Sequence, residues 1–159
     1  MRKWKTVLFI LLGIALVALS FFMGSLIGFQ KGFSAAGMTS STAELWLFHD
    51  HLTRQMANAD CEGLKNTLND FLAILDKYKD VEGALVSSKT VYYGDNMFTH
   101  GRLALIERKL GNEAAAQEHI KAALEFCAKQ DWKECSADKI FSTIKRIDQK
   151  NPMACLSDE

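Results

Sequence analysis

The chain has 159 residues, 19 Lys and Arg against 19 Asp and Glu, and therefore a formal net charge of zero. This length suits one compact domain with a short appendage, and the charge balance argues against a nucleic-acid binder, which normally carries a surplus of Lys and Arg. With 10 Gly and a single Pro, the composition argues against a disordered chain and favours helices over a β-sandwich or barrel.

The N-terminal segment carries the strongest signal in the sequence. No charged residue occurs from Thr6 to Gln30, and most of these positions are apolar. Because about 20 helical residues cross the hydrocarbon core of a bilayer, we expect a transmembrane helix over 6–30. The basic tail 1–5 precedes it, so the positive-inside rule predicts a cytoplasmic N-terminus and an exported remainder.

A cleaved signal peptide is the alternative interpretation of this segment. Its basic start and the small residues Ser34, Ala35 and Ala36 resemble a cleavage site. The apolar run, however, exceeds the roughly 7–15 residues of a signal-peptide core, and the small residues lie well beyond the end of that run. We therefore favour a retained anchor and leave cleavage open.

Small residues recur at a spacing of four within and just after the expected membrane helix. This spacing places them on one helix face, where another helix can approach closely. The face comprises Ser20, Gly24, Gly28 and Gly32. It predicts a contact with another membrane subunit or with a second copy of the chain.

The remainder is predicted to be an all-α domain. We expect a short polar linker, or a fraying extension of the membrane helix, over 31–41. An exported helical domain over 42–150 and a C-terminal tail over 151–159 are expected to follow. Apolar residues at helical spacing and capping residues predict about five helices in the exported domain. These helices are expected at 42–57, 61–79, 89–110, 113–129 and from a cap at Asp131 or Ser136 to about 150.

One pair of these helices resembles a tetratricopeptide repeat, over about 97–124. The matching residues are Leu103, Ala104, Gly111, Ala116, Ile120 and Ala123. Two features depart from the family pattern: Glu107 stands where the family prefers Tyr, and no Pro follows the second helix. The resemblance implies two antiparallel helices that turn at Gly111 and a role in protein interaction.

The four cysteines predict two disulfides, because an exported domain lies in an oxidising compartment. Cys127 and Cys135 flank a predicted turn and are the favoured pair, which leaves Cys61 and Cys155 to join the tail to the second predicted helix. Free buried thiols are the alternative. No cysteine pair has the spacing of a redox motif or a haem attachment site.

We predict no catalytic, metal or cofactor site. His49 and His51 point to different sides of a helix, and His100 and His119 are isolated in the sequence. The common nucleophile, zinc and phosphate-binding motifs are absent from the sequence. An enzyme that uses His49, Asp50 or His119 is the least favoured interpretation.

These observations predict a single-pass protein of the bacterial inner membrane whose helical domain is periplasmic. We expect it to act in protein interaction, as a scaffold or an accessory subunit of an envelope complex. Its expected partners are the lipid bilayer and other membrane or extracytoplasmic subunits, or a second copy of the chain. The alternative is an anchored carrier of a small apolar ligand, with aromatic residues lining its pocket: Trp46, Phe48, Phe71, Tyr78, Tyr92 and Tyr93.

Overall fold

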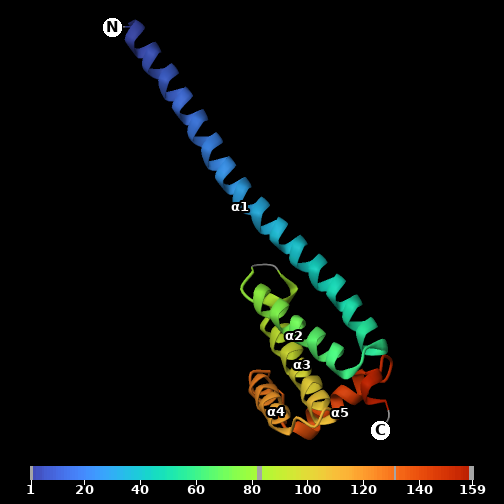
Figure 1. The fold of residues 1–159 in the computed structure, drawn as a ribbon. Coiled ribbons are helices and arrows are strands. Elements are labelled where there is room, and N and C mark those ends of the chain that lie inside the picture. The colour runs from blue at the N-terminus through green and yellow to red at the C-terminus, as the bar shows by residue number, and fades with distance from the viewer. Residues whose placement is uncertain (1, 82–83, 131, 158–159) are drawn as a thin grey trace.

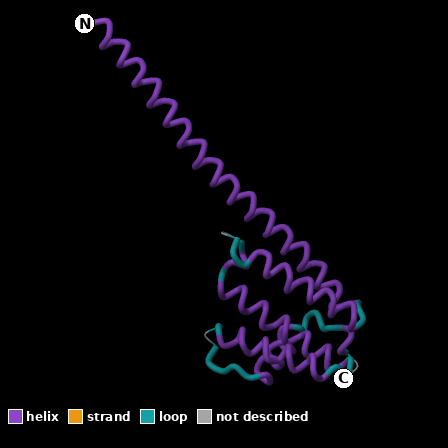
Figure 2. The backbone as a smooth tube through the Cα atoms, turned by 60° about the vertical axis from the view of Figure 1, so that its left-hand side comes forward, coloured by secondary structure: helices purple, strands orange, loops and turns teal. Residues whose placement is uncertain are grey.

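A long helix projects from a compact helical body in the computed structural model of the chain (Figure 1). The structure describes residues 2–81, 84–130 and 132–157, without the side chains of 2–18, 26, 29–31, 33–38 and 85. Over these residues it contains helices and no strand (Figure 2). The α-helices are α1 (Arg2–Asn58), α2 (Cys61–Tyr78), α3 (Lys89–Lys109), α4 (Glu113–Ala128) and α5 (Ala137–Ile147), and the short 3-10 helices are η1 (Leu85–Ser87) and η2 (Ala154–Leu156). The all-α fold class is therefore confirmed.

Helix α1 is continuous from Arg2 to Asn58 and therefore runs through the segment 31–41. That segment contains small and polar residues but no proline, so nothing in it prevents backbone hydrogen bonding along the helix. Ser41 lies inside α1 and is fully buried. The expected helix 42–57 is therefore the C-terminal part of a much longer helix.

Within the part of the chain described above, no helix is both long enough and apolar enough to cross a membrane. The predicted transmembrane segment 6–30 falls for the most part on side chains outside that description.

The C-terminal part of α1 packs against α2. Leu52 and Met56 point into the main core, where they join Leu64 and Leu68 of α2. Two turns closer to the N-terminus of α1, Glu44 meets α2. The Lys77 ammonium of α2 donates to both Glu44 carboxylate oxygens at 3.1 and 2.9 Å. The Tyr78 hydroxyl also donates to Glu44, and these contacts lower the pKa of the Glu44 carboxyl, the Tyr78 bond most strongly. Apolar packing and this polar cluster together fix the direction in which α1 leaves the body.

Helix α2 begins where the sequence predicts. Asp60 is its N-cap and accepts a hydrogen bond from the Gly63 amide at 2.7 Å. An Asx cap of this kind satisfies a backbone donor that the helix itself leaves without a partner. The observed range Cys61–Tyr78 is within one residue of the expected helix 61–79.

Helices α3 and α4 form an antiparallel hairpin. Gly111 lies in the turn between them with φ +80°, a conformation that glycine adopts without strain. The Gln130 side chain, just beyond α4, donates to the Thr90 carbonyl at the start of α3. This contact ties the open end of the hairpin together.

Helix α5 crosses α3 where Gly101 allows close approach. Ser136 caps α5 by accepting a hydrogen bond from the Lys139 amide at 3.3 Å. Of the two predicted caps, Asp131 and Ser136, the structure therefore uses Ser136. A Cβ at Gly101 would lie 2.5 Å from Ile144 Cδ1 and 3.0 Å from Ile140 Cγ2. Both isoleucines are 1% exposed, so the absent side chain of Gly101 is what lets α5 enter the core.

Two disulfides join the cysteines in the predicted pairs. Cys127 and Cys135 connect the end of α4 to the segment before α5, with Cα atoms 5.7 Å apart. Cys61 at the start of α2 pairs with Cys155 in η2, with Cα atoms 5.1 Å apart. The second bridge, together with the buried Met153, holds the described C-terminal segment against the body.

The two bridges are expected to contribute unequally to stability. The Cys61–Cys155 bridge closes a loop over 94 positions and the Cys127–Cys135 bridge one over 8. Loop-closure entropy assigns about 5 kcal/mol to the first and about 2.5 kcal/mol to the second. We expect Cys61→Ser/Cys155→Ser to lower the free energy of unfolding more than Cys127→Ser/Cys135→Ser, as measured by urea denaturation. Equal losses, or the reverse order, would contradict this account.

Candidate functional site

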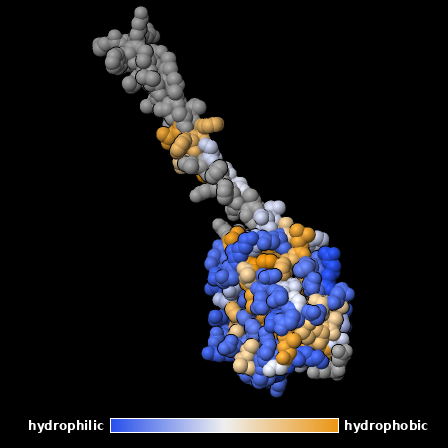
Figure 3. Space-filling model, viewed as in Figure 1, coloured by the Kyte–Doolittle hydropathy of each residue, from blue (hydrophilic) through white to orange (hydrophobic). Residues whose placement is uncertain are grey.

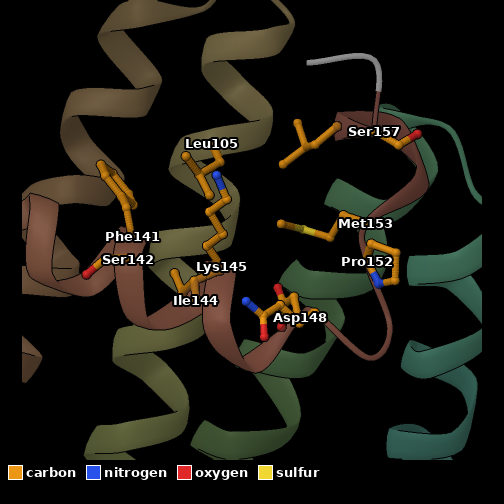
Figure 4. Close-up of a pocket in the computed structure, with 11 residues that line it drawn as sticks. Leu105, Phe141, Ser142, Ile144, Lys145, Asp148, Pro152, Met153 and Ser157 are labelled. Carbon is orange, nitrogen blue, oxygen red and sulfur yellow. The ribbon is translucent and has the colours of Figure 1, made fainter.

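The body carries an apolar groove between α3, α5 and the C-terminal segment (Figure 4). Its volume is about 540 Å³. Its apolar lining comes from Leu105, Phe141, Ile144, Pro152, Met153 and Leu156. This size lies within the usual range of small-molecule sites, which are mostly apolar with a few polar groups.

A buried ion pair lies beside the groove. Arg102 of α3 donates through Nε and Nη2 to the two Asp148 carboxylate oxygens, at 3.0 and 2.6 Å. The two side chains are 13% and 8% exposed. Because Asp148 is neutralised by this bidentate pair, its charge is not available to a ligand in the groove.

Lys145 supplies the other charge at the groove. Its side chain extends from α5 toward Leu105 in Figure 4. Pro152 and Met153 form the opposite wall, which the Cys61–Cys155 bridge fastens to the body. The groove therefore offers an apolar surface and one ammonium group, an arrangement suited to an amphipathic anion.

A second polar cluster stabilises the hairpin turn. Glu107 is 6% exposed and accepts a hydrogen bond from the Asn112 side-chain amide at 2.8 Å. Its other oxygen lies 3.6 Å from the Lys65 ammonium of α2. The residue that departs from the tetratricopeptide pattern thus links the turn at Gly111 to a third helix.

The hairpin also brings together His100 and His119, whose Nδ1 atoms lie 3.0 Å apart. The His100 ring stacks on Phe126 with an interplanar angle of 13°. Burial, and to a lesser degree the His119 charge, lowers the pKa of His100 to about 4. Burial also lowers the pKa of His119, against the opposing charges of Glu107 and Glu118. Both imidazoles are therefore neutral near pH 7 and share one hydrogen bond.

Sequence reasoning treated these two histidines as isolated. A hairpin that turns at Gly111 places residues at similar distances before and after the turn side by side, so the register predicted from that glycine was the signal that could have found them. The Arg102–Asp148 pair has no comparable signal, because its partners are 46 positions apart and belong to helices without a short connection.

The other predicted site residues are not gathered into one site. An added Cβ at Gly24, Gly28 or Gly32 would meet nothing within 4 Å, and Ser20 on the same face is exposed. His49, Asp50 and His51 are exposed on α1.

Of the six aromatic residues proposed for a carrier pocket, Phe71, Tyr78 and Tyr92 belong to one core cluster. Trp46 is 70% exposed, whereas Phe48 stacks on Phe71 with ring centroids 5.5 Å apart. Tyr92 and Tyr93 pack against Phe126 of α4. Over the residues that the structure describes, no group of three or more metal-ligating side chains occurs.

The chain is matched by no protein-family model, and neither a curated protein nor a solved structure is similar to it. Its function must therefore be argued from its own residues.

The His100–His119 pair predicts an acid-sensitive fold. The folded-state pKa of His100, about 4, is below its ordinary value of 6.5, so the unfolded chain binds more protons between these values. We expect the free energy of unfolding to fall as the pH decreases from 6.5 toward 4, and His100→Gln to reduce this dependence. Urea denaturation over this pH range measures it, with the exposed His51→Gln as control. An unchanged slope in His100→Gln would refute the assignment.

Proposed function

We propose that this protein is a single-pass inner-membrane protein whose exported helical domain acts in protein interaction, as a scaffold or accessory subunit of an envelope complex. The exposed apolar side chains on the projecting part of α1 carry this proposal (Figure 3). They are Leu19, Phe21, Phe22, Met23 and Ile27, with exposed fractions of 66, 79, 66, 54 and 50%. Burying each of them in a lipid core is worth roughly 1.5–3 kcal/mol, so their exposure to water is unfavourable.

The surrounding sequence supports insertion into lipid. These residues fall within the uncharged run Thr6–Gln30, which begins after the basic tail 1–5. That arrangement favours a cytoplasmic N-terminus by the positive-inside rule. The residues from 1 to 32 include no Asp or Glu, so all the acidic residues of the chain belong to the exported part.

The disulfides support export. Structural disulfides persist in oxidising compartments such as the bacterial periplasm and are rare in the cytosol. A chain in which Cys61 pairs with Cys155 and Cys127 with Cys135 suits the periplasmic side of the membrane.

The interaction role is supported by the α3–α4 hairpin and its resemblance to a tetratricopeptide repeat. Repeats of that family present helical surfaces to other proteins and catalyse nothing themselves. A helix continuous from the membrane segment into the body would also transmit the orientation of a membrane partner to the exported domain.

Membrane fractionation tests the anchor. We expect the intact chain to stay in the pellet after alkaline carbonate extraction, because a transmembrane helix resists removal of peripheral proteins. Leu16→Arg should release a substantial share of it, since a central Arg costs roughly 2.5–3.5 kcal/mol on insertion scales. The exposed Lys121→Arg, on α4, is the matched control.

Two outcomes would contradict the proposal. Complete extraction of the unaltered chain by carbonate would exclude a spanning anchor. An intact mass that lacks the residues before Ala36 would establish signal cleavage, and the helical domain would then be secreted.

A carrier of a small apolar anion is the second candidate function, favoured by the groove of Figure 4. We expect a co-purifying amphipathic acid, detected by mass spectrometry of extracts from the protein in lipid nanodiscs. Lys145→Glu should deplete this compound by roughly tenfold or more, because it replaces the ammonium at the groove with a like charge. Lys121→Glu is the control, and equal recovery from both variants would eliminate this function.

A further inference from the structure

The part of α1 beside the body has an exposed outer face with two large apolar side chains. The residues of this stretch that turn toward the body are buried or half-buried: Ser41, Leu45, Phe48, Leu52 and Met56. On the outer face, Trp46 is 70% and Leu47 62% exposed. An exposed Trp next to an exposed Leu is typical of a protein-binding surface, where Trp is enriched among the residues that contribute most to affinity.

A shallow hollow of about 500 Å³, wide open to solvent, lies on the same helix to one side of this face. It is lined by Ser40, Ala43, Glu44, Leu47, Phe48, His51 and Ile74. With about 100° of rotation per helical residue, Trp46 lies roughly 60° to one side of Ala43. Ser40, Leu47 and His51 lie roughly 40–80° to the other side. A protruding indole and a hollow therefore flank one small residue.

We propose that α1 pairs in parallel with α1 of a second copy of this chain, and that Trp46 of each copy enters the hollow of the other. A two-fold axis parallel to the helices places the left side of one helix against the right side of its partner. Trp46 of each copy then faces the hollow of the other copy, and the two Ala43 residues lie between the helices. The surface is complementary to itself, which is the requirement for a symmetric dimer.

The charges on this face agree with the pairing. Asp50 and Arg54 lie one turn apart on the outer face and form an ion pair within α1. In the parallel dimer, Asp50 of one copy faces the side of the partner helix that carries Arg54, so opposite charges meet across the axis. Ala43 is small enough to allow the two backbones to approach.

The parallel orientation rests on the proposed function, because two copies anchored in one membrane hold their α1 helices in the same direction. Trp46 follows Gln30, the end of the uncharged run, by about 24 Å along a straight helix. This distance removes Trp46 from the headgroup region, so a protein partner covers it better than lipid does.

Cysteine crosslinking of the full-length protein in membranes tests the dimer. The four native cysteines are all in disulfides, so Ala43→Cys adds a single thiol. We expect copper phenanthroline to convert this variant to a covalent dimer on non-reducing gels, whereas Lys121→Cys, exposed on α4, stays monomeric.

Two further variants in the Ala43→Cys background test the mechanism. Trp46→Ala should lower the crosslinking yield roughly tenfold, as expected for an interface residue worth more than about 1.4 kcal/mol. Ile147→Ala, another exposed apolar residue at 47%, lies on α5 and should leave the yield unchanged. Ser40→Trp should also abolish crosslinking, because its own indole occupies the hollow.

The outcomes separate this proposal from the proposed function. If the Ala43→Cys variant resists carbonate extraction but forms no covalent dimer, or crosslinks to a different protein, the pairing is wrong while the anchor stands. If crosslinking is insensitive to both Trp46→Ala and Ser40→Trp, the seating of the indole is wrong. If the dimer forms in protein that carbonate releases completely, the membrane function fails and the pairing stands.

Discussion

The packing of α1 on α2 is the constraint on which the rest of the structure depends. Helix α1, from Arg2 to Asn58, forms both the part that projects from the body and one of the helices of the body. Its C-terminal part contributes Leu52 and Met56 to the core, and Glu44 receives hydrogen bonds from Tyr78 and Lys77. Because the helix is unbroken, these contacts at the body also set the direction of its distant N-terminal part.

Covalent and ionic links join the parts of the body that lie outside the α3–α4 hairpin. The short helix α5 joins α3 through Arg102 and Asp148, and Gly101 admits Ile140 and Ile144 at the crossing. Cys61–Cys155 then closes the chain by fastening η2 to the start of α2. The wall of the apolar groove is consequently held by a bond that an oxidising compartment maintains.

Local signals explain which features were predictable. Asp60 and Ser136 cap helices through side-chain contacts three residues ahead, and Gly111 marks a turn that requires positive φ. The two caps and the turn depend only on residues that are close in sequence, so the helix boundaries near them were predicted closely. Over 31–41 the small polar residues permit either a loop or a helix, and continuity with helical segments on both sides decides between them. The His100–His119 and Arg102–Asp148 contacts depend on how helices cross, which no short window contains.

A continuous helix between an apolar segment and a folded body differs physically from a flexible tether. A tether lets the body rotate, and any surface can then meet a partner. With a rigid helix, a residue at a given position has a fixed height and a fixed direction relative to the anchor. If α1 is anchored in a membrane as proposed, Trp46, about 24 Å beyond Gln30, and the hollow beside Ala43 keep the same height in every copy. Self-pairing at equal height costs no strain in the stem, whereas pairing out of register would require α1 to bend or one anchor to leave its depth. The continuity of α1 is thus what makes a specific interaction through this face possible.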